Sequence, residues 1–148
     1  MKLEHEISSK FENSYQKAAI NIIYTYGWLT TNLRVRLNKY DITLQQFNIL
    51  RILRGQFPKP ATVNLLKERM LDKMSDASRI VDRLVQKELV NRCTNPQDRR
   101  AVDITISDRG LELLGKLDDQ MSIIDMINDH MSEEEAAQLS ELLDRFRG

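Results

Sequence analysis

Residues 77–110 read ASRIVDRLVQKELVNRCTNPQDRRAVDITISDRG, and this stretch decides the fold. The part up to Lys87 has the apolar spacing of a helix. Residues 89–94 and 102–107 read as short strands, because apolar and polar side chains alternate in the second of them. The charged and turn-rich segment 95–100 lies between the strands. The pattern predicts a helix followed directly by a two-stranded hairpin.

A second short helix precedes this stretch. We expect Thr62 to cap a helix that ends near Met70, and Asp72 to cap the following helix over residues 73–87. Two short helices joined by a turn of about three residues form a helix-turn-helix candidate. With a hairpin directly after it, the pattern predicts a winged helix-turn-helix. The inner face of the second helix is predicted to hold Met74, Ala77, Ile80, Val81, Leu84 and Val85.

The chain upstream is predicted to be helical as well. Apolar residues recur every three or four positions over residues 11–40, which indicates one long amphipathic helix. No neighbour in the sequence matches its length, so its apolar face must pack on a distant segment or on another subunit. Thr43 and Gln46 have the spacing of a capping box, and a helix is predicted from there to Gly55.

Downstream of the hairpin we expect two further helices. Ser107 is expected to cap a helix over residues 108–130, and Ser132 with Glu135 forms a second capping box. The predicted fold class is therefore mainly α with a small β-hairpin wing and long N- and C-terminal helices. The inner face of the last helix is predicted to hold Ala136, Leu139, Leu142, Leu143 and Phe146.

The composition excludes several classes of protein. The 148 residues are 41% hydrophobic and 30% charged, and no apolar run approaches the ~18 residues that a membrane helix needs. The start of the chain offers no apolar stretch for a secretory signal, and a single cysteine, Cys93, favours a reducing cytoplasm. We interpret Cys93 as a packing residue of the first strand.

The sequence shows no pattern for catalysis or for metal binding. It lacks a nucleophile elbow, a phosphate loop and a paired-carboxylate site. His5, His130 and Cys93 make a poor set of transition-metal ligands, and helix capping explains the acidic run at residues 133–135. We therefore expect no enzyme activity, no cofactor and no metal.

Charge is unevenly distributed along the chain, although the net charge is zero. Residues 1–66 hold nine basic and four acidic residues, residues 67–100 hold nine and six, and residues 101–148 hold four and twelve. A polyanion would therefore meet the first two parts and avoid the last. The alternative is a dipolar surface without a partner.

Residues 78–92 resemble the recognition helix and first wing strand of the MarR family of bacterial transcription regulators. Residues 98–101 and 104–110 are similar to that family's wing tip and to the start of its next helix, at matching spacing. There are two departures from the family pattern. The family often has Gly where this chain has Glu88, and residues 67–70 are bulkier than the small residues common there.

The resemblance implies a single domain over residues 1–148. Residues 43–107 would form the DNA-binding winged helix, and residues 1–40 and 108–148 the dimerisation helices. The protein would then be a sequence-specific transcription regulator, in the form of a ligand-responsive repressor in the cytoplasm.

The resemblance also implies that residues near the start of the second short helix read base edges in the major groove. Arg79 could bind a guanine edge through two hydrogen bonds. The alternative is that Arg79 and Arg83 form solvated ion pairs with Asp76 and Asp82 along the helix. The candidate DNA-binding residues of this segment are Ser75, Asp76, Ser78, Arg79 and Arg83.

The predicted wing offers a second DNA contact. A narrow minor groove concentrates negative potential and attracts arginine. Arg99 and Arg100 lie where the wing would reach that groove, and the family pattern implies that Asp98 braces the tip through an ion pair. The alternative is a hairpin turn with two solvated arginines. Further candidates for phosphate contacts are Lys67, Lys73 and Arg92.

A dimer would read two half-sites, so we expect a near-palindromic operator on double-stranded DNA. The apolar faces of the terminal helices are the expected interface. Any single one of the candidates could instead belong to the core. They are Leu113, Leu114, Leu117, Ile123, Ile124, Ile127, Leu139 and Leu142.

The family often holds a small aromatic ligand between its dimerisation and DNA-binding parts. Tyr24, Tyr26, Trp28 and Tyr40 are the candidates for such a pocket, with core packing as the alternative. We expect no membrane partner. The alternative function is a winged-helix adaptor that binds protein instead of DNA, for which Arg99 and Arg100 would be dispensable.

Overall fold

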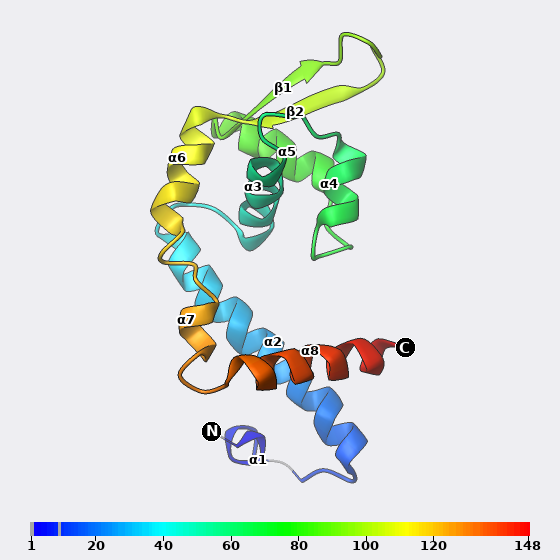
Figure 1. Cartoon of the computed structure of the whole chain (residues 1–148), viewed down its shortest axis with the longest axis vertical. Coiled ribbons are helices and arrows are strands. Elements are labelled where there is room, and N and C mark those ends of the chain that lie inside the picture. The colour runs from blue at the N-terminus through cyan, green and yellow to red at the C-terminus, as the bar shows by residue number, and fades with distance from the viewer. Residues whose placement is uncertain (1, 9) are drawn as a thin grey trace. The chain divides into compact units, whose positions relative to one another are not determined.

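The computed structural model describes residues 2–8 and 10–148. Most of this chain is helical, and its two strands form one hairpin (Figure 1). Residues 1–114 and 115–148 form two compact units. The elements are α1 (Leu3–Glu6), α2 (Ser14–Asn38), α3 (Leu44–Gln56), α4 (Val63–Arg69), α5 (Ala77–Gln86), β1 (Val90–Thr94), β2 (Val102–Ile106), α6 (Asp108–Leu117), α7 (Ile124–Ile127) and α8 (Glu133–Arg147).

The long N-terminal helix is α2, which confirms the prediction of a helix within residues 11–40. The Asn13 side chain accepts a hydrogen bond from the Gln16 backbone N–H and so caps its first turn. Only Thr30, Leu33 and Leu37, in the second half of the helix, are buried. The one-turn helix α1 is not predicted by the sequence. None of the described helices is long and apolar enough to cross a membrane.

Helix α3 begins at the predicted capping box. The Gln46 backbone N–H donates to the Thr43 hydroxyl at 3.1 Å, and the Thr43 N–H donates to the Gln46 side-chain oxygen at 3.0 Å. Ile49, Leu50 and Leu53 then form the buried face of the helix. Because α3 contacts α2, α4, α5 and β2, it is the central element of the first unit.

Helices α4 and α5 pack on each other and on α3 (Figure 1). Thr62 caps α4 as predicted, because its hydroxyl accepts a hydrogen bond from the Leu65 backbone N–H at 3.2 Å. On α5, Ala77, Val81 and Leu84 are buried, at the spacing of one helical face. The predicted helix-turn-helix is therefore present and held by its own apolar contacts.

The predicted start of the second of these helices is wrong. We expected Asp72 to cap a helix over residues 73–87, whereas α5 begins at Ala77 and Asp76 is its N-cap. The Asp72 carboxylate is engaged inside the turn, where it accepts a hydrogen bond from the Met74 backbone N–H at 3.0 Å. Met74 was also predicted on the inner face, but its side chain is 93% exposed.

Strands β1 and β2 form an antiparallel hairpin, and both agree with the predicted strands to within one residue. The register pairs Val90 with Ile106. On the other side of β2, the backbones of Ala61 and Ile104 exchange hydrogen bonds of 2.8 and 2.9 Å. The base of the hairpin is thus fixed to the segment that follows α3, while its loop extends beyond the helices (Figure 1).

The start of α6 lies tightly against the base of the hairpin. The Ser107 hydroxyl accepts a hydrogen bond from the Gly110 N–H at 3.0 Å, as expected for a cap, and donates to the Glu88 carbonyl at 2.8 Å. A Cβ at Gly110 would lie 2.3 Å from the Leu89 carbonyl oxygen and 2.7 Å from Cγ1 of Ile106. Only glycine fits this position without a shift of the backbone.

The predicted helix over residues 108–130 is wrong. Helix α6 ends at Leu117, and the chain becomes helical again only in the short α7. Asp118 and Asp119 follow directly after Leu117. Negative side chains are unfavourable beside the negative C-terminal end of a helix, so these residues favour the break.

Helix α8 begins at the second predicted capping box. The Glu135 N–H donates to the Ser132 hydroxyl at 3.2 Å, and the Ser132 N–H donates to the Glu135 carboxylate at 2.9 Å. No residue of α8 is buried. The prediction of an inward apolar face is therefore wrong for a single protomer, and Leu139, Leu142 and Phe146 are exposed.

Candidate nucleic-acid interface

The exposed face of α5 carries three of the five candidate DNA-binding residues of this segment. Ser78, Arg79 and Arg83 all have exposed side chains there. Ser75 and Asp76 lie just before the helix, and the Asp76 carboxylate accepts a hydrogen bond from the Arg79 backbone N–H at 3.2 Å. Asp76 therefore already has a role as the helix cap.

The ion pairs of α5 differ from those suggested by the sequence. Asp82 pairs with Arg92 of β1, which connects the helix to the hairpin. The alternative in which Arg79 and Arg83 pair with Asp76 and Asp82 is therefore wrong. In the described part of the chain, neither of these two guanidinium groups has an ion-pair partner. Both are available for an external anion.

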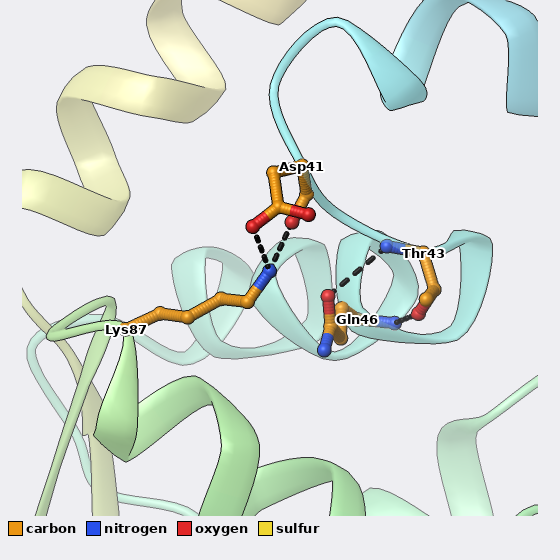
Figure 2. Close-up of polar contacts among 4 residues, drawn as sticks. All are labelled: Asp41, Thr43, Gln46 and Lys87. Atoms are coloured by element: carbon orange, nitrogen blue, oxygen red, sulfur yellow. Dashed lines mark hydrogen bonds and ion pairs between the residues drawn. The ribbon is translucent and has the colours of Figure 1, made fainter.

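The C-terminal end of α5 is anchored to the loop between α2 and α3. The Lys87 ammonium contacts the Asp41 carboxylate at 2.9 Å and also the Asp41 carbonyl oxygen (Figure 2). Asp41 has a left-handed backbone with φ of 54°. The Thr43 and Gln46 capping box fixes the residues that follow it (Figure 2). The C-terminal end of α5 is thus fixed to the segment that leads into α3.

The loop of the hairpin is organised by Asn95, a residue that the sequence analysis missed. The Asn95 side-chain oxygen accepts hydrogen bonds from the N–H groups of Gln97 at 2.8 Å and Asp98 at 3.0 Å. Its amide group donates to the Asp103 carboxylate at 3.0 Å. Asparagine commonly bonds the backbone two residues ahead in turns, so the Asn-Pro pair was the available signal.

Asp98 braces the tip differently from the prediction. Its carboxylate accepts a hydrogen bond from the Arg100 backbone N–H at 2.9 Å, in place of the expected ion pair. The side chains of Arg99 and Arg100 are exposed. Within the described chain, neither guanidinium group makes a hydrogen bond or an ion pair. A structured tip therefore presents two uncompensated positive charges.

Two of the three predicted phosphate-contact residues have partners within the chain. The Lys73 ammonium donates to the carbonyl oxygens of Lys67 and Glu68, at the C-terminal end of α4 where positive charge is favourable. Arg92 pairs with Asp82. Lys67 is exposed on α4 and has no ion pair within the described chain.

Two of the candidates for the aromatic pocket share one groove. Tyr24 and Trp28 line a small groove whose other lining residues come from α1 and α2. Tyr40 does not line this groove, and its place in a ligand pocket stays a prediction. The Tyr24 hydroxyl donates to the Glu6 carboxylate at 3.0 Å, and this hydrogen bond raises the pKa of Tyr24. Tyr26 is exposed on α2 and is not a lining residue either.

Glu88 occupies a position that favours glycine. It has a φ of 60° and follows the C-cap of α5. The Leu89 N–H donates to the Leu84 carbonyl at 3.0 Å, and the Glu88 N–H donates to the Val85 carbonyl at 2.9 Å, which is the pattern of a Schellman motif. The Glu88 carboxylate pairs with Arg109 at 2.6 Å.

Cys93 is exposed, so its interpretation as a packing residue is wrong. Only Val90 of β1 is buried, and the rest of that strand is exposed on both of its faces. The strand therefore extends beyond the core that its first residue joins.

Comparison with known proteins agrees with this geometry. The model of the MarR family matches residues 42–102. The HTH-type transcriptional regulator MhqR of Bacillus subtilis strain 168 is 27% identical over 130 residues, which are 87% of this chain and 88% of that protein.

Solved structures extend the likeness to the whole fold. A mutant of Escherichia coli MarR complexed with operator DNA is 26% identical, with a TM-score of 0.77 and coverage of 93% of this chain and 99% of that one. A MarR-like transcription regulator of Bacillus cereus ATCC 10987 is 24% identical, with the same TM-score of 0.77 and coverage of 90% and 95%. The winged-helix fold class is thereby confirmed.

Proposed function

We propose that this chain, whose residues 42–102 match the model of the MarR family, is a sequence-specific DNA-binding repressor of that family. It acts in the cytoplasm, as a dimer, on a near-palindromic operator, and a small aromatic ligand releases it. The observation that carries the proposal is the pair of uncompensated cationic groups on two elements. One group is Arg79 and Arg83 on α5, and the other is Arg99 and Arg100 on the hairpin loop.

These two groups suit the two grooves of B-form DNA. The major groove admits a helix, and arginine binds a guanine edge there through two hydrogen bonds. The narrow minor groove attracts arginine by its potential. We assign base contacts to Arg79 and Ser78, minor-groove contact to Arg100, and support of the wing tip to Asp98. E. coli MarR, at 26% identity, has been crystallised with operator DNA.

We assign the remaining candidate DNA contacts according to the interactions that each side chain makes within the protein. Lys67 and Arg83 are exposed without an ion pair in the described chain and would meet phosphates. Lys73 and Arg92 first stabilise the turn and the hairpin, through the α4 carbonyls and Asp82. Ser75 and Asp76 lie at the start of α5, where Ser75 would contact DNA and Asp76 primarily caps the helix.

Dimer formation is proposed from the apolar side chains that the protomer leaves exposed. Leu114 and Leu117 are buried within the protomer and leave the set of interface candidates. Exposed apolar side chains that a second copy would cover include Ile123, Ile124, Leu139 and Leu142. Two copies related by a two-fold axis would place two α5 helices on successive major-groove faces.

The groove beside Tyr24 and Trp28 is the proposed place for the releasing ligand. One aromatic ring and one phenol line it, and the Glu6 carboxylate holds the phenol hydroxyl at 3.0 Å. A flat aromatic molecule would stack on such rings.

Fluorescence anisotropy tests the proposal. The labelled duplex is the DNA upstream of the protein's own gene, measured against a scrambled duplex at two salt concentrations. Selective binding that weakens steeply with salt is the expected result. Failure of a folded, dimeric sample to bind either duplex at low salt would overturn it and favour the protein-binding adaptor. Equal binding to both would leave a DNA-binding protein whose operator lies elsewhere.

A further inference from the structure

The turn between α4 and α5 exposes two large apolar side chains. Met74 is 93% exposed and Leu71 is 88% exposed, the two highest values among the large hydrophobic side chains of the described chain. Both belong to the segment between Met70, the C-cap of α4, and Asp76, the N-cap of α5. Neither contributes to the core of the winged helix.

Hydrogen bonds fix this turn. The Leu71 N–H donates to the Asn48 side-chain oxygen of α3 at 3.0 Å, and the Met74 N–H donates to the Asp72 carboxylate at 3.0 Å. The Ser75 N–H donates to the Asp72 carbonyl at 3.3 Å. Hydrogen bonds from the Ser75 side chain and the Met74 N–H lower the pKa of Asp72, so it remains an ionised acceptor near neutral pH. Met74 is thus held outward by the backbone geometry of the turn.

Met74 lies next to the residues of α5 that are proposed to contact DNA. It lies two residues before Asp76, which caps α5, and Ser78 and Arg79 of the first turn are exposed. In a helix-turn-helix, the N-terminal residues of the second helix contact base edges. The polar ends of the serine and arginine side chains form hydrogen bonds there. Met74 therefore adds an apolar side chain to a surface whose other proposed base-contacting residues are polar.

The major-groove edges of the base pairs carry one prominent apolar group, the C5 methyl of thymine. Methionine is unbranched and polarisable, so it adapts its shape to such a small group. A single exposed hydrophobic residue on a protein surface is ordinary. An exposed methionine in a hydrogen-bonded turn, next to the start of the proposed recognition helix, has a defined apolar partner in the groove.

We propose that Met74 contacts the C5 methyl group of a thymine in the operator and thereby selects thymine at one position of each half-site. The inference rests on the proposed DNA-binding function and names a specificity-determining residue for it. Arg79 and Ser78 would read the adjoining bases through hydrogen bonds.

The experiment removes the two partners of the proposed contact one at a time, the thymine methyl group from the DNA and the Met74 side chain from the protein. An operator is obtained by in vitro selection from random duplexes with the full-length wild-type protein. Each thymine of one half-site is then replaced singly by deoxyuridine, which keeps the base pairing and lacks only the methyl. For the wild type we expect about fourfold weaker binding at one thymine, the effect of exposing one methylene-sized group.

The Met74→Ala variant should bind the unmodified operator about sixteenfold more weakly, about fourfold for each half-site that the dimer contacts. The same deoxyuridine substitution should then cause no further loss. Because Met74 is almost fully exposed, this variant should fold, which circular dichroism and the oligomeric state will verify. Leu71→Ala is the matched control, since it removes an equally exposed side chain farther from α5. It should keep the full response to deoxyuridine.

The outcomes separate this inference from the proposed function. If the wild type binds its selected operator but no thymine methyl matters, the role of Met74 is overturned while sequence-specific binding stands. The same holds if Met74→Ala responds to deoxyuridine as the wild type does. If selection with a folded dimer enriches no sequence, both the inference and the proposed function are overturned.

Discussion

The winged helix and the terminal helices differ in where their apolar side chains lie. In the winged helix, Ile49, Leu50, Leu66 and Leu84 are buried within the chain itself, and exposed arginines lie on α5 and on the hairpin loop. In α8, no residue is buried, and Leu142 and Phe146 are each 57% exposed. The N-terminal half of α2 likewise exposes large side chains such as those of Tyr15 and Ile23.

The winged helix therefore buries its apolar core within one protomer, whereas the terminal helices leave apolar side chains that a second surface would have to cover. The winged helix has a closed core, capped helices and a hairpin fixed at its base, so it can hold charged side chains at defined positions. Contiguous exposed apolar side chains indicate an interface. The proposed division of labour, with DNA read by one region and the second copy bound by the other, follows from this contrast.

The largest effect is expected from a substitution that disrupts the closed core of the winged helix. In Gly110→Ala, the new methyl group would lie 2.3 Å from the Leu89 carbonyl oxygen and 2.7 Å from the Ile106 side chain. The base of the hairpin and the start of α6 would have to separate, at a cost of about 3 kcal/mol in the free energy of unfolding. Chemical denaturation measures this loss.

Gly55→Ala is the matched control for that substitution. Gly55 lies within α3, and apart from its chain neighbours and the adjacent helix backbone no atom lies within 4 Å of its Cβ position. Alanine there should stabilise the protein by about 0.5 to 1 kcal/mol, because glycine loses more chain entropy in a helix. Equal effects of the two substitutions would contradict the tight packing between hairpin and α6.

The second prediction concerns the exposed apolar side chains of α8. Leu142→Asp should raise the dissociation constant of the dimer by at least about 100-fold, since it buries an unpaired carboxylate in the proposed interface. The helical content should stay near that of the wild type, because Leu142 is exposed in the protomer. Analytical ultracentrifugation over a range of concentrations measures the constant.

Glu141→Ala is the control for this change, because Glu141 is the exposed polar neighbour of Leu142 on α8. It should sediment as the wild type does. A dimer of unchanged strength in Leu142→Asp would show that the exposed face of α8 is not the interface, and the contrast between the two regions would then need another explanation.

The third prediction concerns the surface that the closed core supports. Arg100→Ala should weaken operator binding by about tenfold to a hundredfold, corresponding to about 1 to 3 kcal/mol. Arg34→Ala removes the same charge from an exposed position on α2 and should change binding little. Anisotropy titrations at several salt concentrations compare the two. Equal losses would mean that only net charge matters and that the hairpin tip makes no groove contact.

Sequence reasoning worked best where the deciding partners are close in the chain. The capping boxes at Thr43 and Ser132 involve residues three positions apart, and the cap at Thr62 is equally local. The hairpin was predicted because alternation and turn residues are also local signals. These elements fix the helix-turn-helix and its wing, and with them most of the candidate DNA-binding surface.

The errors arose where two local signals competed or where the partner is distant. Both Asp72 and Asp76 can cap a helix. In the structure Asp72 accepts its hydrogen bond within the turn, from the Met74 N–H, and Asp76 is the residue that caps α5. The contact between Lys87 and Asp41 joins residues 46 positions apart. No local sequence pattern indicates an ion pair between residues so far apart in the chain, so the contact that fixes α5 could not be predicted.

The smallest effect is expected at Glu88, where the otherwise relaxed winged helix adopts a left-handed backbone. Glu88 has a φ of 60°, which costs a residue with a Cβ about 1 to 2 kcal/mol. Its carboxylate also pairs with Arg109, so a single substitution would mix two effects. Glu88→Gly and Glu88→Ala both remove the ion pair, and only glycine relieves the backbone.

The glycine variant should therefore unfold with a free energy about 1 kcal/mol higher than that of the alanine variant, as measured by urea denaturation. An exposed ion pair contributes less than about 1 kcal/mol, so the glycine variant should be at least as stable as the wild type. Equal stability of the two variants would show that residue 88 leaves the left-handed region when its side chain changes. The Schellman ending of α5 would then depend on the Glu88 side chain and not on the backbone alone.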